Sequence, residues 1–266
     1  MSVQLQDLIT SLVESAPSTE LSSVAENLGA ITTGISKSTI ENAIAEFINS
    51  TPIAISGYII SKFNKDSQSS KYIDFVKEEK FNFDVLKNRI IDVESYSTDG
   101  QINANLVKKL EEYGEDYYRD FTFNIIPEGF ADDNDKSFRI IIIGQKQNQN
   151  NFYTGAWRSE YKVNGDQITG VVALDIHYFE EGNVRLKYTD DEISGTLGKS
   201  GDASGIVNFI NKSENAIELK IIEQFQSLNQ QSFKNLRRVL PVTRSKINWG
   251  NAIGNYRLGS DVVNKK

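Results

Sequence analysis

The stretch that decides the fold runs from Phe152 to Phe179 and reads FYTGAWRSEYKVNGDQITGVVALDIHYF. Both of its halves are rich in β-branched and aromatic residues, which favour strands. Between them lies the polar sequence Asn164-Gly165-Asp166, which is typical of a short hairpin turn. We therefore expect two antiparallel strands, in which the strand that carries Trp157 pairs with the strand that carries His177.

Three further segments of similar composition flank this hairpin. They are Phe121–Ile126, Phe138–Ile143 and Val184–Tyr188, and short polar segments separate them. Connections of this length join antiparallel neighbours, so the sequence predicts a five-stranded antiparallel meander. Because Ile140–Ile143 is apolar at every position, this strand should be covered on both faces.

A long amphipathic helix is predicted after the meander, beyond a flexible stretch at Gly195–Gly205. Apolar residues recur at helical spacing over about 25 residues, and such a helix, about 35–40 Å long, can cross a whole sheet. Its predicted buried face consists of Ile206, Phe209, Ile210, Ile217, Ile221, Phe225 and Leu228. A second helix is predicted from about Asn103 to Tyr118.

The first 50 residues predict three short helices, which end at Pro17, Gly29 and Pro52. Ser38 and Glu41 form a capping-box pattern at the start of the third helix. Helices this short are not stable alone, so they must pack on each other or on a partner. Residues 53–63 are compatible with one strand, and residues 81–91 with a strand or a short helix.

The last 35 residues carry a charge opposite to that of the rest of the chain. Residues 232–266 contain eight basic side chains and one acidic side chain, a net charge of about +7, whereas the whole chain has a net charge of −7. Residues 1–231 are therefore at about −14. A basic end on an acidic body is typical of a segment that binds an acidic surface, such as a protein, an anionic membrane or a nucleic acid.

Composition and motifs exclude several classes of function. The chain has no cysteine and one histidine, so disulfides, thiolate metal sites and multi-histidine metal sites are excluded. No phosphate-binding loop, dinucleotide fingerprint or nucleophile elbow is present. No signal peptide or membrane-spanning run is apparent, which predicts a cytosolic protein.

Two residue groups of the meander invite a catalytic interpretation, and neither supports one. His177 shares a strand face with Ala173 and Phe179, so we expect a packed, structural histidine. Glu180 and Glu181 are adjacent, and adjacent strand residues point to opposite faces, so they cannot serve one substrate as a glycosidase pair. Nothing in the sequence indicates an enzyme.

Three segments, in the right order, resemble the F-actin capping protein alpha subunit family. The first is Tyr153–Tyr161 (YTGAWRSEY) and the second is Ile176–Val184 (IHYFEEGNV), in which Glu181 replaces the family's usual aspartate. The third is the basic stretch Phe233–Trp249, FKNLRRVLPVTRSKINW. The resemblance covers residues 151–249, and the first 100 residues add only a compatible helical pattern.

The resemblance implies an α+β fold in four regions. Residues 1–50 form an N-terminal helical stalk, residues 51–118 a small mixed region with a connecting helix, and residues 119–231 the sheet with its covering helix. Residues 232–266 form a basic, amphipathic, actin-binding extension. The partner, an obligate beta subunit, is expected to continue the sheet.

The implied function is to cap the barbed end of an actin filament by steric occlusion, without calcium, nucleotide, metal or other cofactor. The docking residues implied by the family are Lys234, Arg237, Arg238, Arg244, Lys246, Trp249, Ile253, Tyr256 and Arg257. Lys234 and Arg238 lie one helical turn apart and align with the family's actin-contacting positions. The resemblance also implies inhibition by phosphoinositides, binding of capping regulators, and a place in the cortical actin cytoskeleton.

Alternatives to this interpretation remain open from the residues alone. The basic cluster also fits a solvated helix end or an internal tether to the acidic body. Gly250, Gly254 and Gly259 disfavour a helix in the tail, so the tail helix is expected to be short or to form only when bound. The rival functions are a lipid- or nucleic-acid-binding module, although the tail lacks the stacking aromatics that nucleic acid favours, and an enzyme that uses carboxylates on the sheet.

Overall fold

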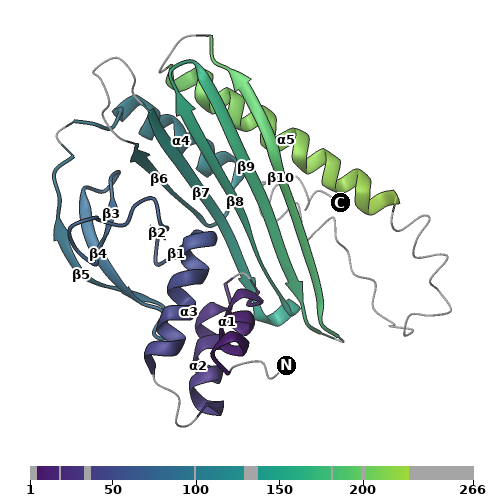
Figure 1. Cartoon of the computed structure of the whole chain (residues 1–266). Coiled ribbons are helices and arrows are strands. Elements are labelled where there is room, and N and C mark those ends of the chain that lie inside the picture. Colours follow the sequence, from purple (N-terminus) through teal and green to yellow (C-terminus); the bar gives the residue numbers. More distant parts are fainter. Residues whose placement is uncertain are drawn as a thin grey trace.

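The computed structural model describes residues 5–17, 19–32, 37–98, 100–128, 137–180, 182–198 and 202–227. Three helices open the chain: α1 (Leu5–Glu14), α2 (Leu21–Ile31) and α3 (Lys37–Ser50). They pack on each other through a shared core that includes Ile9, Val13 and Ile44. Figure 1 shows them together at one end of the molecule, in purple and blue. The prediction of three short, mutually packed helices is confirmed.

Two details of these helices differ from the prediction. Helix α2 continues through Gly29 to Ile31, because a glycine lowers helix stability by only about 1 kcal/mol and packing elsewhere on the helix exceeds that cost. Helix α3 begins at Lys37, one residue before the predicted start at Ser38. Glu41 forms an ion pair with Lys37 across one turn, at 3.4 Å.

Residues 53–95 form two small antiparallel sheets in place of the single strand and the ambiguous segment that were predicted. The first is the hairpin of β1 (Ile53–Ile55) and β2 (Tyr58–Ile60). Its turn residues Ser56 and Gly57 both have positive φ, 49° and 78°, as a type I′ turn requires. The second has the order β3-β4-β5, with β3 (Tyr72–Asp74), β4 (Glu79–Asp84) and β5 (Arg89–Ser95).

The predicted five-stranded meander is present. Its strands are β6 (Phe121–Pro127), β7 (Ser137–Asn148), β8 (Tyr153–Asn164), β9 (Gln167–Tyr178) and β10 (Val184–Thr196), in the spatial order β10-β9-β8-β7-β6. A 3₁₀ turn, Gln149–Asn151, joins β7 to β8. All neighbours are antiparallel, and Trp157 pairs with Leu174. The β8–β9 hairpin closes at Asn164 and Gln167 around Gly165, whose φ is 61°.

The two faces of this sheet are covered by different parts of the chain (Figure 1). Helices α4 (Ala104–Tyr117) and α5 (Ala203–Ser227) lie on one face, where Trp157, Ile140 and Ile142 join the main core. On the other face, Ile141 and Ile143 pack with Ile59 of β2. All four isoleucines of Ile140–Ile143 are buried, which confirms the prediction of a strand covered on both sides.

A buried carboxylate fixes α5 over the sheet and α4. Glu214 is 0% exposed and accepts hydrogen bonds from the hydroxyls of Tyr113 (2.7 Å) and Tyr118 (2.6 Å) of the α4 region. Further along the helix, Lys220 forms an ion pair with Asp190 of β10 at 3.0 Å. Helix α5 therefore crosses from α4 to the β10 side. Of its predicted buried residues, Ile206, Ile210, Ile217 and Ile221 are buried and Phe209 is half-buried, while the Phe225 side chain and Leu228 lie outside the described part.

Candidate functional site

The nine docking residues predicted from the sequence all lie outside the described residues, so their positions are not assigned. They are Lys234, Arg237, Arg238, Arg244, Lys246, Trp249, Ile253, Tyr256 and Arg257. The described part of the chain contributes a different kind of candidate site, a surface for a partner chain. This surface consists of the sheet edge at β10, helix α1 and the pocket between them.

Strand β10 is an open edge of the main sheet. It has 13 residues, and within the described residues no strand pairs with its outer side. Such an edge presents a row of backbone donors and acceptors that can pair with another chain. A β-bulge interrupts it, because Asp191 and Glu192 stand together opposite Val171. The bulge divides β10 into a longer regular part at Val184–Asp190 and a shorter one after it.

The opposite edge strand, β6, is shorter, with 7 residues, and one face of it contacts the β3 region. The side-chain amide of Asn124 donates to the carbonyl of Ile73 (3.0 Å) and its oxygen accepts from the Phe75 N–H (3.1 Å). Asn124 is fully buried by these contacts, and Pro127, which has no N–H, ends the strand. Of the two edges, the 13-residue β10 therefore offers a partner the longer row of backbone donors and acceptors.

The two faces of β10 differ in chemistry. Leu186, Tyr188 and Ile193 pack against the main core that β10 shares with α5. Arg185 and Lys187 alternate with them on the other face, as residues of a strand do. A strand that pairs with β10 would therefore meet an apolar row on one face of the sheet and a basic row on the other.

Helix α1 adds an apolar surface that the described part of the chain does not cover. Ile9 and Val13 are buried, but Leu5, Leu8 and Leu12 are 54%, 48% and 42% exposed. These leucines are spaced three and four residues apart, so they form one stripe along the helix. Helix α1 therefore packs on its neighbours through one set of residues, and its leucine stripe fits a partner.

Arg185 connects helix α1 to the β10 edge. Its guanidinium donates to the backbone carbonyls of Ala16 (2.8 Å) and Ser15, directly after α1. It also forms a bidentate pair with Asp175 of β9, at 2.8 and 2.7 Å. The end of α1 is therefore held against the first residues of β10.

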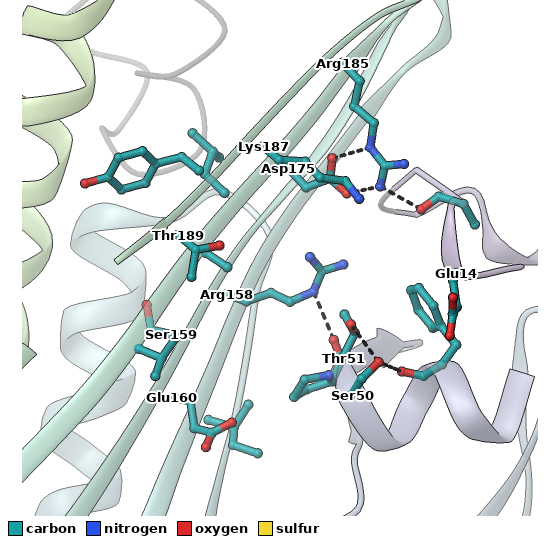
Figure 2. A pocket seen from close by; sticks show the side chains of 18 residues that line it. Glu14, Ser50, Thr51, Arg158, Ser159, Glu160, Asp175, Arg185, Lys187 and Thr189 are labelled. Carbon is teal, nitrogen blue, oxygen red and sulfur yellow. Dashed lines mark hydrogen bonds and ion pairs between the residues drawn. The ribbon is translucent and has the colours of Figure 1, made fainter. Parts of the chain in front are cut away.

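A pocket of about 340 Å³ lies beside this edge, between the sheet and helices α1 and α3 (Figure 2). The sheet side is lined by Arg158, Asp175, Arg185, Lys187 and Thr189, and the helix side by residues that include Glu14, Ser50 and Thr51. Arg158 donates from Nε to the carbonyl of Pro52, after the end of α3, at 3.0 Å. Burial lowers the pKa of its guanidinium to about 10, which leaves it charged at neutral pH.

His177 is a structural histidine, as predicted. It is 9% exposed, and its ring nitrogens lie 2.7 Å from Glu20 Oε1 and 2.7 Å from Asn183 Oδ1. Glu20 also accepts a hydrogen bond from the Thr154 hydroxyl at 2.6 Å. These contacts join the start of α2 to strands β8 and β9. Among the described residues no group of three or more histidine, cysteine or carboxylate side chains is placed to bind a metal.

Sequence patterns do not reveal the contacts of Glu20 or the edge position of β10, for identifiable reasons. Glu20 lies more than 130 positions from Thr154 and more than 150 from His177, and no local pattern predicts such a contact. A signal did exist for β10, in which Arg185 and Lys187 alternate with Leu186 and Tyr188. This alternation indicates a strand with one basic face, but only the topology shows that it lies at an edge.

No helix within the described ranges is long and apolar enough to cross a membrane. A solved structure has a similar fold. The solved structure of the homodimeric actin capping protein alpha subunit from Plasmodium berghei superposes with a TM-score of 0.68, covering 90% of this chain and 98% of that one at 21% identity. This similarity concerns the fold.

Sequence comparison identifies the family. The F-actin-capping protein subunit alpha of Candida albicans is 51% identical over 285 residues, which cover both chains completely. The corresponding subunit of Debaryomyces hansenii is 52% identical over 271 residues, covering all of this chain and 99% of that one. The model of the F-actin capping protein alpha subunit family matches residues 9–261. The chain therefore belongs to the F-actin capping protein alpha subunit family, a family of actin-binding proteins that are not enzymes.

Proposed function

We propose that this chain caps the barbed ends of actin filaments as the alpha subunit of a heterodimer with a capping protein beta subunit. The observation that carries this proposal is the match to the family over residues 9–261, which includes nearly the whole of the basic tail. The cap acts by occupying the filament end, so that actin subunits neither add nor leave.

The beta subunit pairs with the open edge of β10 and continues the sheet. Three features support this location: the absence of a strand on the outer side of β10 among the described residues, the greater length of β10 compared with β6, and the exposed stripe of Leu5, Leu8 and Leu12. In this arrangement the N-terminal helices form a stalk, and the leucine stripe packs against helices of the partner. An exposed apolar stripe and an open strand edge both favour an obligate assembly.

The basic tail docks the heterodimer onto actin. Lys234 and Arg238 make the principal contacts, and the other basic residues of 237–257 steer and strengthen them, because Arg and Lys pair well with acidic groups. Trp249, Ile253 and Tyr256 then lay an apolar face into a groove on the filament end. Steric occlusion and charge attraction need no calcium, nucleotide or metal, so capping proceeds equally with and without a calcium chelator.

The same tail explains the regulation that we propose. Anionic phosphoinositides compete with actin for the basic residues, since each Lys or Arg near an anionic leaflet contributes about 1 kcal/mol of binding. Capping regulators bind the remaining surface of the heterodimer. The protein works in the cytoplasm, in cortical actin structures, and has no role in nucleic-acid binding.

The test is actin elongation from barbed-end seeds in the presence of this chain co-expressed with its beta subunit. The intact heterodimer should stop elongation at about nanomolar concentration, whereas Lys234→Ala/Arg238→Ala should need at least about 100-fold more, because two charge-assisted contacts are lost. The matched control is Lys108→Ala/Lys109→Ala on α4, which removes the same charge from the body of the protein.

Elongation that continues at all concentrations of the intact heterodimer would contradict the capping function. Equal effects of the two double variants would contradict docking through Lys234 and Arg238. Since the relative from Plasmodium berghei is a homodimer, light scattering of this chain expressed alone is included. A stable homodimer that caps without the beta subunit would replace the heterodimer in this proposal.

A further inference from the structure

The sheet side of the pocket beside β10 carries three basic residues, Arg158, Arg185 and Lys187, and two acidic residues, Glu160 and Asp175. Two of its acidic residues are already engaged: Glu160 pairs with Arg139, and Asp175 is held bidentately by Arg185. Asp175 is also the carboxylate whose charge acts on the buried guanidinium of Arg158. The charges of both guanidinium groups thus act on Asp175, in a site where charges interact more strongly than in water.

Lys187 adds a third positive charge at the side of the pocket that faces the open edge. It is exposed, and within the described residues it forms no ion pair. The remaining acidic residue of the lining, Glu14, is exposed at the end of α1 and likewise has no ion pair with any described residue. At the side of the pocket that faces the open edge, Lys187 is therefore the positive charge that an incoming anion can meet.

Because Lys187 lies on an edge strand, a strand that pairs with β10 can bring an anionic side chain to it. Arg185, Lys187 and Thr189 alternate along β10 and all line the pocket. A strand that pairs with β10 places its side chains directly opposite these residues, with Cβ atoms about 5 Å apart. A side chain opposite Lys187, on the same face of the sheet, would lie at the pocket mouth.

The pocket is large enough for a whole side chain. Its volume of about 340 Å³ is roughly ten times the share of one water molecule in the liquid, about 30 Å³. The hydroxyls of Thr51 and Thr189 line it and can donate hydrogen bonds to a carboxylate, whereas the Ser50 hydroxyl already donates to the carbonyl of Phe47 at 2.8 Å.

We propose that this pocket receives the carboxylate of an aspartate or glutamate from the strand that the beta subunit pairs with β10. The carboxylate binds Lys187 at the mouth and reaches towards Arg158. This ion pairing sets the register of the two strands, because a slip by one residue would turn the acidic side chain to the apolar face. The inference rests on the proposed pairing of the beta subunit with β10.

The test uses the co-expressed heterodimer of full-length chains. Lys187→Met keeps the length of the side chain and removes its charge, and Lys187→Glu reverses the charge. Light scattering over a dilution series measures the dissociation constant of the heterodimer. We expect this constant to rise about tenfold for Lys187→Met and at least about 100-fold for Lys187→Glu, since like charges at an interface are strongly unfavourable. The matched control, Lys108→Glu, reverses an exposed charge on α4 and should change it less than about twofold.

A rescue experiment identifies the partner residue. Each acidic residue of the pairing strand in the beta subunit is replaced by lysine in the Lys187→Glu background, and one replacement should restore the dissociation constant to within about threefold of wild type. Circular dichroism of each variant heterodimer verifies that the chain is folded.

Three results would overturn the inference, and they are distinguishable. A wild-type chain that does not bind the beta subunit contradicts the proposed function as well. A stable wild-type heterodimer whose dissociation constant is unchanged by Lys187→Met and Lys187→Glu contradicts only the inference. The third result is a dissociation constant unchanged by both variants, together with a thermal midpoint of the wild type that rises when inorganic phosphate is added. If Lys187→Glu abolishes this rise, the pocket binds a free anion instead.

Discussion

Two glycines inside helices differ in the space around them. A Cβ added to Gly29 of α2 would meet no atom within 4 Å, whereas one added to Gly114 of α4 would lie 2.1 Å from the ring of Phe121. Replacing a helix glycine by alanine gains about 1 kcal/mol of helix stability, and overpacking a core costs about 1–3 kcal/mol. We expect Gly29→Ala to raise the thermal midpoint of the heterodimer and Gly114→Ala to lower it. A rise in both would show that Phe121 moves aside freely.

The buried carboxyl of Asp74 should give the stability a specific pH dependence. Asp74 is 1% exposed, its Oδ1 accepts from the backbone N–H groups of Val76 (3.1 Å) and Lys77 (2.9 Å), and burial raises its pKa above the usual 3.8. The folded protein therefore binds this proton more tightly than the unfolded chain. As the pH rises from 3.8 through the raised pKa, the stability of the wild type should fall relative to that of Asp74→Asn.

Asp66 is the matched control for this measurement. Its pKa is lowered to about 2, chiefly by the hydroxyl of Ser69, so its contribution to stability is complete above the usual value of 3.8 and is lost only as the pH falls towards 2. Thermal midpoints of the wild type and both variants are compared from about pH 4 to about pH 7. The difference in thermal midpoint between the wild type and Asp66→Asn should stay constant over this range. A constant difference between the wild type and Asp74→Asn would contradict the effect of burial on the Asp74 carboxyl.

At the scale of elements, a small number of polar contacts join the N-terminal helices α1 and α2 to the main sheet. Glu20, just before α2, joins Thr154 of β8 and His177 of β9, at 2.6 and 2.7 Å. Hydrogen bonds to a charged group contribute about 1.5–3 kcal/mol each, so Glu20→Ala should increase amide hydrogen exchange in α1 and α2 about tenfold or more while leaving β8 and β9 nearly unchanged. Glu26→Ala, an exposed position of the same helix, is the control. Equal exchange in the two variants would refute the fastening role.

The elements differ in how far the sequence predicts them, for physical reasons. The β8–β9 hairpin is predictable because its turn sequence and its composition act locally, and the Ile140–Ile143 run identifies a doubly covered strand in the same way. The three-residue strands β1 and β2 are too short to show a period, although Ser56-Gly57 signals their turn. Helix α2 passes Gly29 because its packing, which is non-local, outweighs a local preference.

The candidate site likewise has one part that the sequence predicts and one part that it does not. The basic tail is visible in the sequence because charge is a property of composition, and its residues remain predictions because they lie outside the described part of the chain. The partner face is not visible in the sequence. Lys187 becomes a candidate only when the topology places β10 at the edge and folding brings Arg158 and Asp175 beside it. Local patterns therefore predict elements, and long-range contacts create the pocket.

For the whole molecule, the separation of charge predicts how capping responds to salt. The body carries a charge of about −14 and the tail about +7, so the tail alone attracts an acidic filament end while the body is repelled by it. Salt screens both effects over about 8–10 Å. The rate at which the intact heterodimer binds barbed ends should therefore fall steeply between about 50 mM and about 200 mM KCl, because the tail makes the first contact.

A chain that ends at Gln231 removes the tail and keeps β10, α1 and α5, so the heterodimer should still form. Its binding to barbed ends should be weaker by at least about 100-fold, and added salt should leave its association rate unchanged or raise it, since only the repulsive body remains. Seeded elongation at both salt concentrations measures the rates, and light scattering verifies that the heterodimer is intact. A truncated heterodimer whose rate falls with salt as steeply as that of the full-length protein would place the docking charges on the body. In that case the basic tail would be an internal tether to its own acidic body, the alternative that the sequence left open.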